Sequence, residues 1–193
     1  MGKWTVPVLS IDVEDAHSYA EGSRDHTQRK LEHQQSRYSD IKRNIVVGRV
    51  ARNVVARVLQ EASIPCPFEE TPATRSKSYS IVTANGHFIQ PRFIGDYPRH
   101  KNFLEDVGSF ERRPHEFYVA TVSLDDLRNM DILGYATRGE LEERKPRGFG
   151  HGVLNCYVPL DRLHPFPELI ELLRADPDAA LQSAHVTSHE SLL

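Results

Sequence analysis

The chain has no apolar run that reaches the roughly 18 residues needed for a membrane-spanning helix, and its first residues lack the apolar segment of a secretory signal. Cysteine is also scarce, since Cys66 and Cys156 are the only two, lie far apart and form no C-x-x-C pair. These absences argue against membrane association, a disulfide framework and a zinc cluster. We expect a protein of a reducing compartment that is not secreted through a signal peptide.

A strong excess of one charge is missing as well. Lys and Arg number 24 against 27 Asp and Glu, a formal net charge of −3, so the chain lacks the global basic surplus of a dedicated nucleic-acid coat protein. Basic faces can still form locally. The 193 residues, of which 39% are hydrophobic, suffice for one core with extensions but not for a second full domain.

Changes in composition divide the chain into residues 1–40, 41–173 and 174–193. In the first part, the run from Trp4 to Glu14 alternates apolar and polar residues and predicts a strand. The stretch from Asp15 to Asp40 is so polar that it predicts a loose arm or a solvated helix unless something holds it, and we favour contact with other protein subunits. The last part is a polar tail.

Residues 41–62 predict the main helix. At 100° per residue, apolar side chains fall on one broad arc: Ile41, Val47, Val50, Ala51, Val54, Val55, Val58, Leu59 and Ala62. The basic residues fall on the opposite arc: Lys42, Arg49, Arg52 and Arg57. The pattern therefore predicts a helix that packs through its apolar face and leaves its basic face free.

The Asn85-Gly86 pair lies between two short β-prone runs, which is a strong hairpin signal because both central residues of a type I′ turn need positive φ. Further strands are predicted at 114–122, 130–136 and 153–159, with a short helix at 138–145 capped by Thr137 and Glu140 and a closing helix near 163–173. This order predicts an α/β (α+β) fold, a mixed sheet with helices packed against it.

From about Ile41 to Leu173 the chain resembles the PD-(D/E)XK nuclease-like family. The resemblance rests on the helix, the Asn-Gly hairpin, the strand Phe117-Tyr-Val-Ala-Thr-Val122 and the phrase Ile132-Leu-Gly-Tyr-Ala-Thr-Arg-Gly-Glu-Leu141, which is similar to proteins of viruses and mobile elements. It implies a restriction-endonuclease-like core, with a central mixed β-sheet flanked by helices, and a location in the cytoplasm or in a virion.

The family's metal-binding motif is degenerate in this chain. The resemblance places Ser80, Gln90 and Arg92 where the family has an Asp, an Asp or Glu, and a Lys. None of the three is an anionic ligand, and the guanidinium of Arg92 is a poor proton shuttle, so no catalytic residue and no cofactor are expected. The alternative is that the acids have migrated to carboxylates flanking the hairpin, which would restore a Mg²⁺ site: Glu69, Glu70 and Asp96.

A basic loop beside the hairpin is the candidate nucleic-acid contact, formed by Arg92, Arg99, His100 and Lys101. A solvated loop is the competing interpretation. Arg144, Lys145 and Arg147 could act in the same way, although a surface turn is favoured there. The leading functional hypothesis is a non-catalytic structural or assembly component of a virus particle or mobile-element complex, with DNA as a further partner. The alternative is a Mg²⁺-dependent DNA endonuclease with migrated acids.

Overall fold

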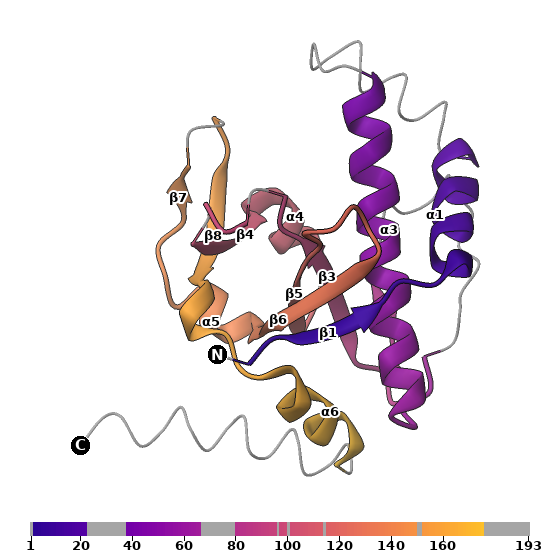
Figure 1. Cartoon of the computed structure of the whole chain (residues 1–193). Coiled ribbons are helices and arrows are strands. Elements are labelled where there is room, and N and C mark those ends of the chain that lie inside the picture. The colour runs from indigo at the N-terminus through magenta and orange to yellow at the C-terminus, as the bar shows by residue number, and fades with distance from the viewer. Residues whose placement is uncertain are drawn as a thin grey trace.

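The computed structural model describes residues 2–22, 38–66, 80–95, 97–99, 101–113, 115–149 and 152–175, with side chains in the second range from residue 43 onward. Figure 1 shows a central sheet, with helices α1 and α3 on one side of it and a smaller sheet on the other. Glu69, Glu70, Asp96 and His100 lie outside the described residues.

The larger sheet has five strands in the order β1 (Trp4–Pro7), β6 (Asn129–Thr137), β5 (Phe117–Val122), β3 (Phe88–Phe93) and β2 (Ile81–Val82). All neighbours are antiparallel except β3 and β5. The smaller, antiparallel sheet has the order β4 (Asn102–Asp106), β8 (Leu154–Pro159) and β7 (Arg147–Gly148). Together with the helices, this arrangement confirms the predicted α+β class.

The helices are α1 (Ser10–Gly22), α3 (Tyr38–Glu61), α4 (Val107–Arg112), α5 (Arg138–Glu142) and α6 (Phe166–Arg174), with a 3-10 turn η1 at Leu160–Arg162. Thr137 caps α5 as predicted, because its hydroxyl accepts from the Glu140 N–H while the Glu140 carboxylate accepts from the Thr137 N–H. Within the described ranges, every helix is too short or too polar to cross a membrane.

Two hydrophobic cores lie on opposite faces of the five-stranded sheet. Alternation along β5 divides its residues between them: Val119 belongs to the core under α3, while Tyr118 and Ala120 belong to the core shared with the smaller sheet. On β3, Ile89 faces α3, so Gln90 and Arg92 point toward the smaller sheet. The candidate metal positions are therefore on the face away from α3.

The predicted hairpin is present, but its turn differs in type from the one expected. The Gly86 N–H donates to the Thr83 carbonyl, and the Thr83 N–H donates to the His87 carbonyl, which closes a loop of three residues. Gly86 has φ +86°, whereas Asn85 is not among the residues with positive φ. A type I turn followed by a left-handed glycine meets both observations, because it needs only one residue with positive φ.

Helix α3 is buried on nearly every side, and the predicted free basic face is wrong. Arg52 is only 5% exposed, and its Nε donates to the Ser80 carbonyl. Arg49 and Arg57 are ion-paired with Asp15 and Asp12 of α1. The periodicity locates the apolar arc correctly but cannot show that α1 covers the polar one.

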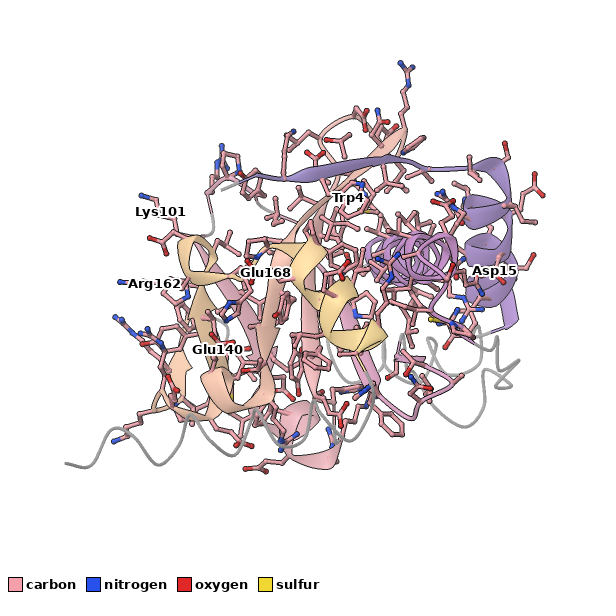
Figure 2. All side chains as sticks on the ribbon, turned by 90° about the horizontal axis from the view of Figure 1, so that it is seen from below. Trp4, Asp15, Lys101, Glu140, Arg162 and Glu168 are labelled. Carbon is pink, nitrogen blue, oxygen red and sulfur yellow. The ribbon has the colours of Figure 1, made fainter. Side chains whose placement is uncertain are left out.

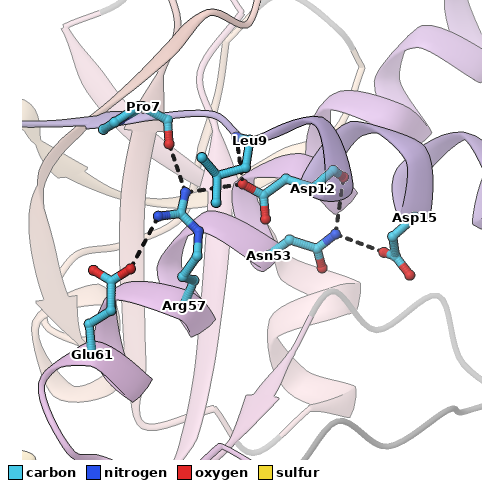
Figure 3. A network of polar contacts seen from close by, with 7 residues as sticks. All are labelled: Pro7, Leu9, Asp12, Asp15, Asn53, Arg57 and Glu61. Atoms are coloured by element: carbon cyan, nitrogen blue, oxygen red, sulfur yellow. Dashed lines mark hydrogen bonds and ion pairs between the residues drawn. The ribbon is translucent and has the colours of Figure 1, made fainter.

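A network of polar contacts fixes α1 to α3 (Figure 3). The Arg57 guanidinium donates to the Pro7 carbonyl at 2.7 Å and to an Asp12 carboxylate oxygen at 3.0 Å. The Asn53 amide donates to the Asp12 carbonyl at 3.2 Å and to the Asp15 carboxylate at 2.7 Å. These contacts join the beginning of the chain to the central helix.

The predicted strand from Trp4 to Glu14 is correct only as far as Pro7. Residues 10–22 form α1 instead, because Asp12 reaches back to accept from the Leu9 N–H and because Ala16 and Ala20 are small enough to pack closely on α3. The expected loose arm is therefore a packed helix up to Gly22. Of the rest of that arm, residues 38–40 begin α3, and residues 23–37 lie outside the described residues.

Candidate functional site

Two of the three degenerate metal positions are in direct contact. Ser80 immediately precedes β2, and antiparallel pairing of β2 with β3 brings it beside Gln90. The Ser80 hydroxyl lies 3.5 Å from the Gln90 side-chain carbonyl oxygen. Arg92, two residues further along β3, points to the same face. The topology thus brings Ser80 and Gln90 together and turns Arg92 to the same face.

His115 completes the polar environment of Ser80. Its Nε2 lies 2.5 Å from the Ser80 hydroxyl oxygen, and its ring is 4% exposed. The Ser80 hydroxyl has one proton, which it can donate to the Gln90 side-chain carbonyl oxygen. The hydroxyl oxygen then accepts from His115, provided that His115 is neutral and carries its proton on Nε2. Burial, and then the charges of Arg113, Arg138 and Arg92, lower the pKa of His115 to about 4. Among the described residues, His115 has no carboxylate partner, so its orientation rests on the contact with Ser80 and on the Tyr118 ring.

Arg92 is held by a buried carboxylate on the smaller sheet. Its Nη2 lies 2.9 Å from Glu105 Oε2, and the Glu105 side chain is only 5% exposed. Within the described part of the chain this oxygen has no hydrogen-bond partner, so its contact with Arg92 is an ion pair without hydrogen-bond geometry. Burial raises the pKa of Glu105, although the charges of Arg92 and Arg113 oppose this effect.

Tyr118 lies at the centre of the same face, opposite Gln90 in the parallel ladder. Its ring packs against Phe103, Phe110 and His115, and its buried hydroxyl has no partner among the described residues. Burial, and then the charge of Glu105, raise the pKa of Tyr118. We refer to these buried or half-buried groups as the polar cluster: Ser80, Gln90, Arg92, Glu105, His115 and Tyr118.

The donor set of the polar cluster does not fit a divalent cation. Mg²⁺ and Ca²⁺ need oxygen ligands that include carboxylates, and this cluster offers one carboxylate, which Arg92 already neutralises. Among the described residues, no three His, Cys, Asp or Glu side chains come together as a metal site would require. By themselves, the described groups of the cluster position neutral donors and acceptors and one ion pair.

The Arg92–Glu105 pair predicts an asymmetry between two variants. Arg92→Met should cost on the order of 2 kcal/mol, because it leaves a buried carboxylate without its cation, whereas Glu105→Gln should cost less, since half-exposed Arg92 can be solvated. Urea unfolding measures both. Because the folded-state pKa of Glu105 is raised, protonation favours the fold, and the loss in Arg92→Met should shrink as the pH is lowered. A larger cost for Glu105→Gln would contradict this account.

The structure shows that the basic residues predicted to act together have different environments. Arg92 is committed to Glu105, whereas Arg99 and Lys101 are exposed on the segment that leads into β4. The migrated-acid candidates Glu69, Glu70 and Asp96 lie outside the described residues, as does His100. The structure therefore leaves Arg99 and Lys101 as the accessible cations of this loop within the described part of the chain.

Sequence reasoning missed Glu105, His115 and Tyr118. Glu105 stands two residues after buried Phe103, and this spacing within a strand would have placed both on one face. His115 and Tyr118 come from a predicted strand, but the contact of His115 with Ser80 and the place of Tyr118 opposite Gln90 depend on parallel pairing of β3 and β5, which local patterns do not reveal.

Comparison with protein-family models, with curated proteins and with solved structures gives no match to this chain.

Proposed function

We propose that this protein is a non-catalytic, nuclease-like protein that binds nucleic acid as a component of a larger assembly, of the kind found in virus particles or mobile-element complexes. One observation carries the proposal: the polar cluster, which includes the three residues that the resemblance aligns with a metal site, contains one carboxylate, and this carboxylate is paired with Arg92. The fold class and the placement of Ser80, Gln90 and Arg92 on one face support the restriction-endonuclease-like part of the proposal.

The nucleic-acid part rests on exposed cations outside the polar cluster. Arg99 and Lys101 are accessible, and phosphate contacts of this kind supply most of the sequence-independent affinity for DNA or RNA. The assembly part rests on residues 1–40, which we propose contact other subunits. Because residues 4–22 pack on the domain itself, that contact would have to come mainly from residues 23–37.

The first test is catalysis. Purified protein incubated with single- and double-stranded DNA should show no cleavage with Mg²⁺ or Mn²⁺. Binding of such a cation needs two or more carboxylates, and the only carboxylate of the polar cluster is paired with Arg92. Denaturing gels with a known Mg²⁺-dependent nuclease as a positive control make the measurement. Metal-dependent cleavage that survives repurification would overturn the proposal.

The alternative, a Mg²⁺-dependent DNA endonuclease with migrated acids, is favoured by one feature. Glu105 is a buried carboxylate next to the position where the family has its lysine, and one of its oxygens has no hydrogen-bond partner. If cleavage occurs, Glu105→Gln, Glu70→Gln and Asp96→Asn identify the acids, since each should abolish it. Residual activity unchanged in all three would point to a contaminating nuclease.

A further inference from the structure

The outer face of the smaller sheet carries aromatic, basic and amide side chains. On β8, Cys156 and Val158 point into the core, so Asn155 and Tyr157 point outward. Cross-strand pairing places Arg147 opposite Asn155, and Leu104 opposite Tyr157, on the same outer face. In Figure 1 this sheet lies on the side of the molecule away from α1 and α3. All of these outward residues are exposed or partly exposed.

Two aromatic rings and two guanidinium groups form one contiguous group there. Phe149 and Tyr157 meet edge to face, with ring centroids 5.4 Å apart. Arg144 lies 5.7 Å over the Tyr157 ring, and Arg147 lies 6.0 Å over the Phe149 ring. Each ring is only partly buried, so it offers a face or an edge to a ligand beside a positive charge.

The charge around this group is cationic. Lys101, Arg144, Lys145, Arg147 and Arg162 are exposed, against three exposed acids in the same segments, Glu142, Glu143 and Asp161. Nearby Glu142 is paired with Arg138, and Asp106 accepts from the Ser109 N–H as the cap of α4. The Leu160 N–H donates to the Lys101 carbonyl, and Figure 2 shows Lys101 and Arg162 on one side of the molecule, opposite Asp15.

The turn after β7 adds exposed apolar surface to the same sheet. Val153 is 44% exposed and Leu154 is 58% exposed, next to each other in the chain. Leu154 pairs with Gly148 at the end of the β7–β8 ladder, and alternation along β8 turns it to the side of Cys156 and Val158, away from Tyr157. Stacking is therefore left to the two partly exposed rings, which suit the faces of unpaired bases that a duplex hides within its stack.

We propose that this outer face, which we call the aromatic–basic face (Lys101, Arg144, Arg147, Phe149 and Tyr157), binds single-stranded nucleic acid. Tyr157 and Phe149 stack with bases, while Lys101, Arg144 and Arg147 contact backbone phosphates. The inference rests on the proposed function, because it specifies which surface of the protein binds the nucleic acid and that the bound nucleic acid is single-stranded. Charge complementarity and the clustered rings select this ligand over a second copy of the chain, whose matching face would carry the same positive charge.

The test is fluorescence anisotropy with labelled oligo-dT, oligo-U and a duplex of equal length, measured with the full chain over a range of salt concentrations. Wild type should bind the single strands more tightly than the duplex. Tyr157→Ala should weaken single-strand binding roughly 5- to 150-fold, the usual loss for one stacked base, while Tyr157→Phe keeps the ring and should bind like wild type. The two single strands show whether the sugar matters.

The double variant Arg144→Ala/Arg147→Ala separates phosphate contacts from stacking, and both side chains are exposed enough to change without loss of the fold. It should reduce the slope of log K against log salt by about 1.4, since each phosphate contact contributes about 0.7 on a single strand. The matched control is Arg43→Ala/Arg128→Ala, which removes two exposed charges on α3 and on the β5–β6 turn and should leave the slope much closer to wild type.

The outcomes distinguish the inference from the function on which it rests. If neither Tyr157→Ala nor the double variant weakens binding more than the control does, the aromatic–basic face is not the binding surface. The protein would then bind nucleic acid through another surface. Preference for the duplex would overturn stacking on unpaired bases. Absence of binding to all three ligands at low salt would overturn both. If sedimentation then showed self-association that Tyr157→Ala abolishes, the face would be an interface between copies.

Discussion

Gly134→Ala should destabilise the protein by about 3–5 kcal/mol, through strain of the backbone and overpacking. Gly134 has φ +148°, a conformation that L side chains rarely adopt, and an added Cβ would lie 2.4 Å from the His164 carbonyl oxygen and 3.0 Å from Leu163 Cβ. The carbonyl cannot simply retreat. It accepts from the Tyr135 N–H at 2.9 Å, in a bridge that the His164 N–H completes to the Tyr135 carbonyl at 2.8 Å.

Gly134 also lies where the ladder between β5 and β6 changes register. Ala120 pairs with Gly134 and Thr121 with Ile132, so one extra residue of β6 is accommodated in a bulge. Thermal unfolding followed by circular dichroism measures the effect. The matched control is Gly139→Ala in α5, where the nearest atom is 4.0 Å from the new Cβ, and helix propensity should make it neutral or slightly stabilising. Equal midpoints for the two variants would contradict the proposed clash.

Local patterns in the sequence predict the elements of this fold better than they predict their partners. The periodicity of 41–62, the Asn85-Gly86 pair and the capping pattern of Thr137 and Glu140 each depend on neighbours a few residues away, and each corresponds to an element of the structure. Gly134 stands within a predicted strand, but His164, its close neighbour in space, is 30 positions later and leaves no local signal.

The same distinction explains the errors at the N-terminus and at the candidate site. The alternation from Leu9 to Val13 predicts a strand, yet contacts with α3 favour a helix, because Asp12 and Asp15 meet Arg57, Asn53 and Arg49 there. At the candidate site, the hairpin pattern predicts that Ser80 and Gln90 lie on neighbouring strands, and the structure brings them into contact. The hairpin pattern cannot locate Glu105, because β4 belongs to a different sheet and meets Arg92 only in the folded protein.

Deletion of residues 2–22 should abolish cooperative unfolding of the remaining chain, the reverse of what a loose arm would do. The deletion removes β1, which pairs with β6 from Trp4 to Pro7, and exposes the edge beside the fully buried Met130 and Ile132. It also uncovers Val46 and Val50, which share a stripe of α3 with Asn53 and Arg57. Each apolar side chain of this size contributes about 1.5–3 kcal/mol when fully buried. Four such residues approach the whole stability of a domain, about 5–15 kcal/mol.

Single substitutions in full-length protein test the same interface without removing it. Asp15→Asn should destabilise at neutral pH, whereas Glu14→Gln, an exposed neighbour on α1, should stay within about 0.5 kcal/mol of wild type. Burial alone would raise the pKa of Asp15, but hydrogen bonds from Arg49 and Asn53 outweigh it and lower the pKa.

Because the folded-state pKa of Asp15 is lowered, its ionised form stabilises the protein above its unfolded pKa, about 3.9, and this contribution disappears as the pH falls through the folded value. The difference in stability between wild type and Asp15→Asn, measured by urea unfolding, should therefore be largest near neutral pH and decrease toward acid. A difference that stays constant with pH would mean that the carboxylate charge does not hold α1.

Deletion of residues 2–22 with an unchanged melting curve would show that β1 and α1 lie outside the cooperative core, which would return residues 1–22 to the role of an arm that binds another subunit.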